Sequence, residues 1–332
     1  MEKNLKQRVL SGMRPSGKLH LGHLHGALSN WVELQKKYEC FYFVADWHAL
    51  TTEYEKTDKI KQDSIDMVID WLSVGLDPEK STLFVQSQLL EHAELHLFLS
   101  MITPLPWLER CPTYKEQLKE IKTRDIHTYG FLGYPVLQAS DILIYKADKV
   151  PVGEDQLPHL ELTREIARRF NSLYGEILTE PQALLTKTSK VPGTDGRKMS
   201  KSYNNCIYLS DTPEIISKKI SSYLTDPSRI HPTDQGHPDV CAIYSLQEIY
   251  YENPKEIEEK CKKGTIGCVQ CKKMLAERII KSLEPIHKKQ HELKSNPMLI
   301  NEILKNGTQK AKAVTEKTMS EVRKSLKLWN ME

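Results

Sequence analysis

The sequence contains no long apolar run. No stretch of its 332 residues approaches the roughly 18 consecutive apolar residues that a helix needs to span a membrane. The N-terminal segment from Met1 to Arg8 is charged and lacks the apolar core of a signal peptide. Internal repeats and low-complexity tracts are absent as well. These absences argue against a membrane-bound or secreted chain, and we expect a cytoplasmic protein.

The seven cysteines lack the secretory context in which disulfide frameworks form, so they indicate free thiols or a metal site. The hydrophobic share of 39% and the charged share of 27% are typical of soluble globular proteins, and the length allows two domains. Residues 213–332 carry 21 Lys and Arg against 16 Asp and Glu. That mild excess suits either a polyanionic partner or solvated helix faces.

The first two-thirds of the chain alternates strand and helix signals. Short apolar or aromatic runs at residues 9–10, 40–45, 82–85 and 142–145 are typical of buried strands. Between two of them, a helix is predicted after Thr57 and before Gly75, because Ile65, Val68 and Leu72 recur on one face. Strands that alternate with helices predict a parallel sheet with helices on its faces.

Strand signals become rare after about residue 212, and helical periodicity takes over. The clearest case is the last predicted helix, from Thr308 onward, where Val314, Val322 and Leu326 share one face. We therefore predict the α/β class: a Rossmann-like, nucleotide-binding parallel sheet in residues 1–212 and an all-helical domain in residues 213–332. A helical insertion is expected around residues 92–135.

The first motif follows the first predicted strand and reads SGMRPSGKLHLGHLHGAL over residues 11–28. Its Pro- and Gly-rich part predicts a tight loop, after which His20 to His23 opens a helix. A helix N-terminus presents unpaired N–H groups and a positive dipole end, which suit phosphate. His20 and His23 are one turn apart and can donate to phosphoryl oxygens, while Gly22 lets a nucleotide approach the backbone. An H-x-x-H pair alone is a weak signal, but its place after a strand strengthens it.

The second motif is a basic loop, PGTDGRKMSKSYNN, over residues 192–205. Its Gly, Ser, Asn and Asp content predicts a loop, and Arg197, Lys198 and Lys201 place three cations within five residues. Such a loop can close over a triphosphate and neutralise charge as pyrophosphate leaves. Composition alone would favour a solvated basic loop.

The two motifs together resemble the signatures of the class I aminoacyl-tRNA synthetases. HLGH resembles the HIGH motif of that family, which related nucleotidyltransferases share, and Lys198 to Ser202 reads KMSKS letter for letter. The resemblance extends from about Val9 to Leu328. It implies ATP and Mg²⁺ as cofactors, catalytic roles for Lys198, Lys201 and Lys115, and ATP contacts by Arg14, Ser16, His20, Gly22, His23, Asp155, Lys198, Met199, Ser200 and Lys201.

Two further segments, YPVLQASD at residues 134–141 and VPVGEDQ at residues 150–156, resemble the amino acid pocket shared by tyrosyl and tryptophanyl enzymes. Asp141 precedes a predicted buried strand, so its carboxylate should be desolvated and need a partner. A carboxylate only accepts hydrogen bonds, and both an indole N–H and a phenol can donate one. The expected amino-acid-binding residues are Leu10, His48, Tyr134, Gln138, Asp141, Val152 and Gln156.

Three details favour tryptophan as the substrate. The first predicted strand offers Val9 and Leu10 where tyrosyl enzymes usually carry a tyrosine. VPVGEDQ is closer to the tryptophanyl pattern, and the chain lacks the C-terminal RNA-binding module of many bacterial tyrosyl enzymes. Gln138 points the other way, because many bacterial tryptophanyl enzymes have methionine there. Tyrosine therefore remains the alternative substrate.

Four cysteines of the helical part, Cys241, Cys261, Cys268 and Cys271, form the pattern C-x19-C-x6-C-x2-C. Spacing alone favours structural zinc, although iron–sulfur clusters also use four cysteines. Some tryptophanyl-tRNA synthetases carry a [4Fe-4S] cluster near the anticodon-binding domain on a similar pattern, and that resemblance makes the cluster our expectation and zinc the alternative. Cys40, Cys111 and Cys206 lie in or beside apolar runs and are expected to be core residues.

The resemblance implies L-tryptophan and tRNA(Trp) as substrates, a tryptophanyl-adenylate intermediate and a homodimer. Two other classes of function share part of this pattern. A nucleotidylyltransferase that shares only the first motif is disfavoured by KMSKS and by the basic helical part. A non-catalytic RNA-binding paralogue is disfavoured because both signature motifs are intact.

Overall fold

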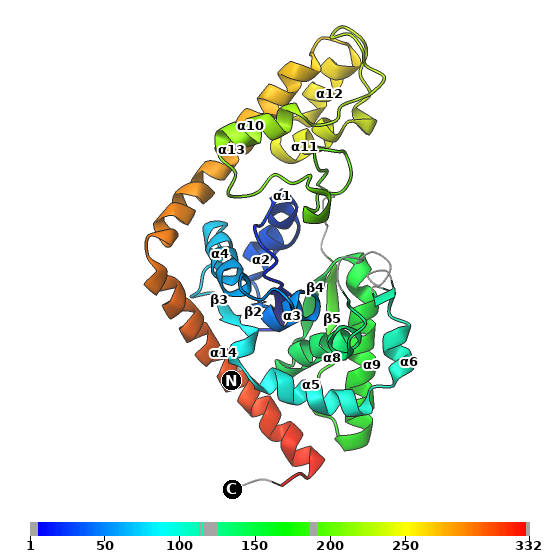
Figure 1. Ribbon diagram of the computed structural model, residues 1–332, viewed down its shortest axis with the longest axis vertical. Helices are drawn as coiled ribbons and strands as arrows, with labels where there is room; N and C mark the ends of the chain where they lie inside the picture. Colours follow the sequence, from blue (N-terminus) through cyan, green and yellow to red (C-terminus); the bar gives the residue numbers. More distant parts are fainter. Residues whose placement is uncertain (1–5, 113, 116–124, 186–190, 330–332) are drawn as a thin grey trace.

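A parallel sheet lies at the centre of the chain, for which a computed structural model describes residues 6–112, 114, 115, 125–185 and 191–329 (Figure 1). Its five strands follow the order β3-β2-β1-β4-β5 and all pair in parallel. They are β1 (Arg8–Met13), β2 (Glu39–Val44), β3 (Ser81–Val85), β4 (Lys149–Val152) and β5 (Gln182–Leu185). The predicted α/β class with a Rossmann-like sheet is therefore confirmed.

Helices connect the strands and cover both faces of the sheet. The connection from β1 to β2 holds α1 (Leu21–His23), a π-helical turn η1 (Leu24–Leu28) and α2 (Ser29–Leu34). The next connections hold α3 (Asp46–Glu53) and α4 (Ile60–Ser73), then η2 (Gln86–Gln88), α5 (Glu91–Ile102), α6 (Leu105–Glu109) and α8 (Tyr129–Ile144), and finally η3 (Glu154–Gln156) and α9 (Leu157–Tyr174). Part of the insertion expected around residues 92–135 lies outside the described residues.

Successive strand residues feed two separate cores, as the period of two requires. Val9 and Tyr42 face α2 and α4, whereas Leu10 and Phe43 face α5, α8 and α9. The helix predicted between Thr57 and Gly75 is α4, which begins at Ile60 and ends just before Gly75.

The strand predicted at residues 142–145 is wrong. These residues form the end of α8, where Ile142, Leu143, Ile144 and Tyr145 are all buried. The helix lies against the sheet and is flanked by α5 and α9, so its last turn is apolar on every side. A short continuous apolar run cannot by itself distinguish a buried helix from a buried strand.

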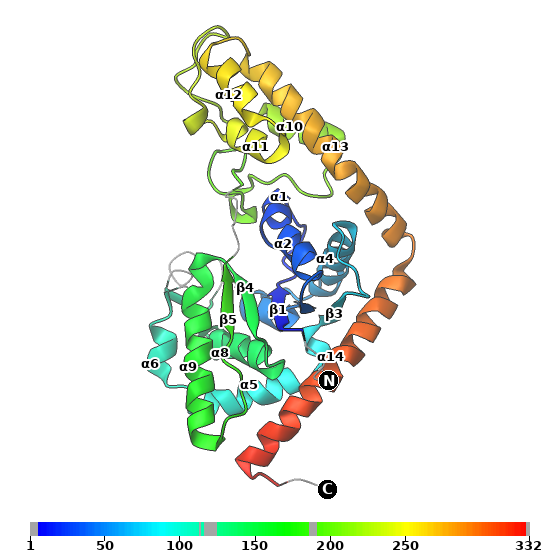
Figure 2. The same ribbon diagram turned by 180° about the vertical axis from the view of Figure 1, so that it is seen from behind.

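After the sheet the described chain is helical, with α10 (Pro213–Ser221), η5 (Pro238–Val240), α11 (Ala242–Tyr250), α12 (Pro254–Lys262), α13 (Cys268–Lys294) and α14 (Pro297–Leu326). The first four form one end of the molecule, and the long helices α13 and α14 run from it along the sheet half (Figure 2). No described helix is long and apolar enough to cross a membrane.

Helix α14 returns to the first half of the chain. It starts at Pro297, 11 residues before the predicted start at Thr308, and packs along β3 and α5. Its Ala311, Met319 and Val322 belong to the core of the sheet. A Cβ atom at Gly307 would lie 1.8 Å from the carbonyl oxygen of Leu83, so only glycine fits at this crossing. The division at residue 212 stays a prediction, and α14 packs with the part before it.

Candidate active site

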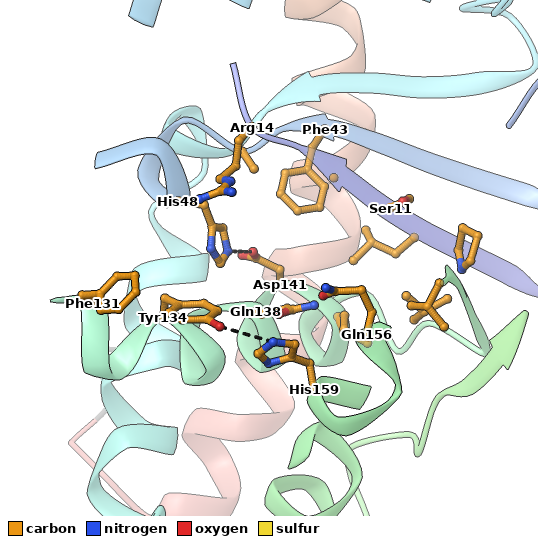
Figure 3. A pocket seen from close by; sticks show the side chains of 17 residues that line it. Ser11, Arg14, Phe43, His48, Phe131, Tyr134, Gln138, Asp141, Gln156 and His159 are labelled. Carbon is orange, nitrogen blue, oxygen red and sulfur yellow. Dashed lines mark hydrogen bonds and ion pairs between the residues drawn. The ribbon is translucent and has the colours of Figure 1, made fainter. Parts of the chain in front are cut away.

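A cavity of about 320 Å³ opens at the carboxyl ends of β1 and β4, where the strand order changes direction (Figure 3). In open parallel sheets, ligands bind at such a point. The lining includes all the residues expected to bind an amino acid: Leu10, His48, Tyr134, Gln138, Asp141, Val152 and Gln156. Arg14, expected to contact ATP, lines it as well. Residues spread over 147 positions of sequence thus meet in one place.

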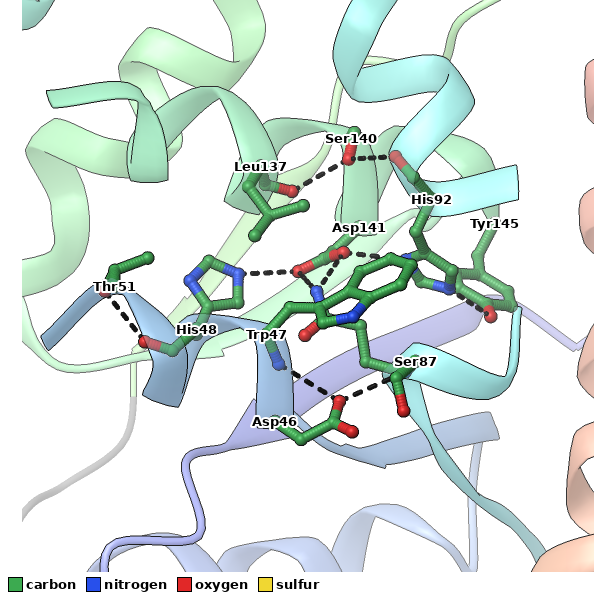
Figure 4. A network of polar contacts seen from close by, with 11 residues as sticks. Asp46, Trp47, His48, Thr51, Ser87, His92, Leu137, Ser140, Asp141 and Tyr145 are labelled. Atoms are coloured by element: carbon green, nitrogen blue, oxygen red, sulfur yellow. Dashed lines mark hydrogen bonds and ion pairs between the residues drawn. The ribbon is translucent and has the colours of Figure 1, made fainter. Parts of the chain in front are cut away.

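Asp141 lies at the bottom of this cavity and accepts hydrogen bonds from three side chains (Figure 4). His48 Nε2 donates to Oδ2 at 2.8 Å and His92 Nδ1 to Oδ1 at 2.7 Å. The amide of Gln86 donates to both oxygens, at 2.8 and 2.9 Å. Burial alone would raise the pKa of Asp141, but hydrogen bonds from His48 and His92 outweigh it and hold the pKa below its usual value. The group is therefore a desolvated, fully hydrogen-bonded carboxylate.

Gln86, His92 and Tyr145 are functional candidates that sequence reasoning missed. Gln86 directly follows β3 and His92 lies in the first turn of α5, so both stand at the carboxyl edge of the sheet. Tyr145 closes the chain of contacts, with its hydroxyl 2.9 Å from His92 Nε2. A polar residue immediately after a buried strand, as in FVQSQ, was the available signal for Gln86.

A second polar chain reaches the cavity through Tyr134 and His159. The Tyr134 hydroxyl lies 3.2 Å from His159 Nε2 (Figure 3). On the other side of the ring, His159 Nδ1 lies 3.5 Å from the Cys111 thiol. Burial lowers the pKa of His159, so the ring is neutral at neutral pH. Gln156 donates to Asp155 at 2.9 Å. His159 was also missed, and Cys111 is buried as expected.

The two histidines of the first motif sit at the start of α1 and cap it reciprocally. His20 Nδ1 accepts from the N–H of Gly22 at 3.1 Å, and His23 Nδ1 accepts from the N–H of His20 at 3.2 Å. A Cβ atom at Gly22 would lie 2.8 Å from the His20 ring, so this glycine makes room for the cap. The cap thus gives a local reason for glycine at this position, and the role of Gly22 at a nucleotide stays a prediction.

Electrostatics keep both rings neutral. Burial, followed by the positive charges of Lys201 and Lys198, lowers the pKa of His20 to about 4. Burial, followed by His20 and Lys201, lowers the pKa of His23 to about 3. Because each Nδ1 accepts a backbone N–H, the single proton of each neutral ring must be on Nε2. Both rings thus keep an N–H donor that the helix cap does not use.

Lys201 brings the second motif against the first. Its ammonium group donates to Ser16 O at 2.9 Å, to Gly17 O at 3.0 Å and to Ser16 Oγ at 3.3 Å. Burial lowers the pKa of Lys201, although nearby Asp63 opposes the shift. The cation is therefore held against the loop that precedes α1 by neutral acceptors.

The rest of the KMSKS loop is folded around Asn205, whose side chain accepts from Ser200 N at 2.8 Å and donates to Asp195 at 2.7 Å. Met199 is buried, while Lys198 is exposed. The Arg197 guanidinium lies 4.0 Å over the Tyr203 ring. Loop conformation is thus fixed by one buried amide.

Two predicted residues are exposed and are not among the described residues that line the cavity, Lys115 and Asp155. Asp155 accepts a hydrogen bond from Gln156, which does line the cavity. Their roles at ATP stay predictions.

The four cysteines of the C-terminal part gather in one corner. Cys241 precedes α11, Cys261 lies on α12, and Cys268 and Cys271 begin α13. The Arg229 guanidinium lies 3.8 and 3.9 Å from the sulfurs of Cys261 and Cys268. Among the residues that the structure describes, however, no three Cys, His, Asp or Glu side chains are close enough together to hold a metal ion.

Comparisons with known proteins identify the family. The family described as tRNA synthetases class I (W and Y) matches residues 2–284. A tryptophan–tRNA ligase of Thermotoga maritima is 51% identical over 325 residues, covering 97% of this chain and 99% of the relative. One of Aquifex aeolicus is 45% identical over 393 residues, covering 97% and 100%. The chain belongs to the class I tryptophanyl-tRNA synthetases.

Solved structures agree with this membership. The tryptophanyl-tRNA synthetase of Campylobacter jejuni, complexed with ADP and tryptophan, has a TM-score of 0.89 at 35% identity and covers 97% of this chain and 100% of its own. That of Mycoplasma pneumoniae has a TM-score of 0.82 at 30% identity, covering 98% and 99%. A tyrosyl-tRNA synthetase of Archaeoglobus fulgidus, at 24% identity and a TM-score of 0.67, shares the fold. Tryptophan is thereby favoured over the tyrosyl alternative.

Proposed function

We propose that the chain ligates L-tryptophan to tRNA(Trp) with ATP, through a tryptophanyl-adenylate. The observation that carries this function is near-complete coverage of tryptophan–tRNA ligases at 45–51% identity. The cavity around Asp141 supports it, because a buried carboxylate in a pocket that Leu10, Phe43 and Phe131 also line suits an indole with one N–H.

The reaction has two steps. A carboxylate oxygen of tryptophan forms a bond to the α-phosphorus of ATP while the bond to the bridging oxygen breaks, and pyrophosphate leaves. A terminal ribose hydroxyl of the tRNA then attacks the adenylate carbonyl and releases AMP. Neither step needs a covalent enzyme intermediate, so the protein contributes position and charge. Mg²⁺ would arrive with ATP and neutralise its phosphate oxygens.

The residues divide between the two substrates. We assign the indole N–H to Asp141 and the amino group to Tyr134 and Gln156, with Gln138 and His48 nearby. At the other end, the free Nε2–H groups of His20 and His23 can donate to phosphate oxygens. Lys201 and Lys198 can follow the departing pyrophosphate, where negative charge develops.

An amino-acid-dependent ATP–pyrophosphate exchange assay tests this function. Exchange should depend on tryptophan and should be near background with tyrosine or phenylalanine. Faster exchange with tyrosine would overturn the substrate while leaving the class intact. Absence of exchange with every amino acid, in folded protein that binds ATP, would overturn the enzyme assignment.

We further propose that Cys241, Cys261, Cys268 and Cys271 hold a [4Fe-4S] cluster in a helical part that contacts the anticodon. The four thiols are not close enough together in this structure to hold a metal ion, so the support is their chemistry. Four cysteines are the ligand set of such a cluster, and the N–H groups of Arg229 and Gln247 lie near three of the sulfurs, as thiolates prefer. The cluster would supply a structural cross-link there and no step of adenylation.

Metal analysis tests the cluster. Protein purified without air should be brown and contain about four iron and four sulfide per chain. Cys268→Ser should remove the colour and leave tryptophan activation largely intact. One zinc and no iron would replace the cluster by a zinc site, and neither metal would mean that the thiols are simply half-buried.

A homodimer is the third proposal, and exposed apolar residues of α5 support it. Leu97 and Met101 lie one turn apart on this helix and are 51% and 71% exposed, while Leu90 just before it is 72% exposed. A row of this kind suits burial against a second copy. Sedimentation should give a dimer, and Leu97→Glu should shift it toward monomer; a monomeric parent protein would overturn the proposal.

A further inference from the structure

The amino acid pocket has a feature that its proposed role does not explain: Asp141 has no vacant position for the substrate. A carboxylate offers about four lone-pair positions in its plane. Gln86 covers the inner edge by reaching both oxygens, His92 takes the outer side of Oδ1, and His48 takes the outer side of Oδ2 (Figure 4). A substrate N–H can therefore reach Asp141 only by replacing one of the three.

Gln86 and His92 are poor candidates for replacement, because both are 0% exposed. His92 is also held from its other side by the hydroxyl of the buried Tyr145. The Gln86 amide keeps its N–H groups on Asp141 although its own Oε1 is buried without a hydrogen-bond partner. Turning the amide over would set two acceptors against each other, so its orientation is dictated by the carboxylate.

His48 differs from these two in position. It lies on α3, lines the cavity together with Asp141, and its side chain keeps 12% of its surface exposed. Gln86 and His92 are not among the lining residues. A ligand in the cavity therefore approaches Asp141 from the side that His48 occupies.

We propose that His48 is an exchangeable donor, which satisfies Asp141 Oδ2 in the free enzyme and gives up that position to the indole N–H of bound tryptophan. Gln86 and His92 are positioning residues that stay in place and keep the carboxylate ionised and oriented. This inference rests on the proposed function, because it takes the indole N–H to Asp141. His48 would then determine how much the indole N–H contributes to the affinity for tryptophan.

The exchange predicts how removal of His48 changes the relative affinity for tryptophan and for an analogue without the ring N–H. In the parent protein an analogue with sulfur in place of the ring N–H, β-(benzothiophen-3-yl)alanine, leaves His48 on Asp141, so no buried acceptor is orphaned. Tryptophan gains one hydrogen bond and loses another. Without His48, the analogue leaves Oδ2 unpaired whereas tryptophan fills it, and an unpaired buried acceptor is costly. Removing His48 should therefore increase the preference for tryptophan.

The test is a comparison of dissociation constants for tryptophan and the benzothiophene analogue by calorimetry, in the absence of ATP. His48→Phe keeps a ring and removes the donor. We expect the Kd of the analogue divided by the Kd of tryptophan to rise roughly 5- to 50-fold over the parent value. His48→Gln restores a donor and should return the ratio toward the parent value. Thr51→Val is the control for disturbance of α3, because Thr51 Oγ1 bonds His48 O at 2.8 Å, and it should leave the ratio unchanged.

The alternative outcomes are distinct. An unchanged or lower ratio in His48→Phe, with a ratio that still responds to Asp141→Asn, would overturn the exchange and leave Asp141 as the indole acceptor. A ratio insensitive to both changes would show that Asp141 does not sense the ring N–H. Failure of the parent to bind tryptophan would instead reject the proposed function.

Discussion

The proposed amino acid site around Asp141 and the proposed nucleotide site around Lys201 hold their key charges in opposite ways. Asp141 is bonded by side chains from η2, α3 and α5, two of which are fully buried. Lys201 is bonded by two carbonyls and a hydroxyl of a loop. Both charges are satisfied before substrate arrives, but only the first is held by rigid elements. On the proposed function, we expect the amino acid site to supply selectivity and the nucleotide site to move with the reaction.

The substitution with the largest expected effect on the difference between the two sites is Lys201→Ala. Because the loop cation should act mainly where charge develops, activation should slow by about 10²–10³ while tryptophan affinity stays near the parent value. Single-turnover adenylate formation and tryptophan titration measure the two effects separately. Lys218→Ala, an exposed lysine of α10, is the matched control for loss of a positive charge. A parental rate in Lys201→Ala would remove Lys201 from the reaction.

Asp141→Asn should give the reverse pattern. The amide adds a donor that faces the donors His48, Gln86 and His92. An unsatisfied buried group costs roughly 1–3 kcal/mol, or about 5- to 150-fold in kcat/KM for tryptophan. The KM for ATP should be nearly unchanged. Equal losses for both substrates would mean that the change disturbs the fold rather than the pocket.

Acid should destabilise the protein through the buried histidines of the first motif. His20, His23 and His25 have folded-state pKa values near 4, 3 and 4, below the unfolded value of about 6.5. The unfolded chain therefore binds more protons between these values, and stability falls as the pH drops from about 6.5 toward 4, on the order of 1 kcal/mol per histidine by pH 5. Urea midpoints at pH 7 and pH 5 measure the loss. His25→Gln should show a smaller loss; an identical one would exclude His25 as a source.

The smallest expected effect is that of Tyr145→Phe. The hydroxyl supports His92 and touches no substrate, so its loss should cost about 0.5–1.5 kcal/mol, a roughly 2- to 10-fold rise in the KM for tryptophan at unchanged kcat. Steady-state exchange kinetics measure it. A fall in kcat at constant KM would assign Tyr145 to the chemical step. It would contradict the separation of tryptophan selectivity from catalysis between the two sites.

Sequence reasoning located much of this site because the signals were local. HLGH, KMSKS and the segment around Asp141 are contiguous, and their placement after strands or in loops follows from turn residues and periodicity. It failed where an environment is made by tertiary packing. Residues 142–145 look like a strand because every side of the end of α8 is buried. The contacts of Gln86 and His92 could not be predicted, because their partner Asp141 lies 55 and 49 residues away in sequence.

The return of α14 to β3 has a consequence for synthesis on the ribosome. The strand is made by residue 85, but the helix that covers it, Pro297–Leu326, emerges more than 200 residues later. Until then the apolar surface that receives Ala311, Met319 and Val322 has no cover, and a nascent chain with an uncovered face is prone to aggregate. The core of the sheet is thus completed only when the last helix has been made. Premature termination within α14 should therefore destabilise the sheet, although the missing residues lie far from it in sequence.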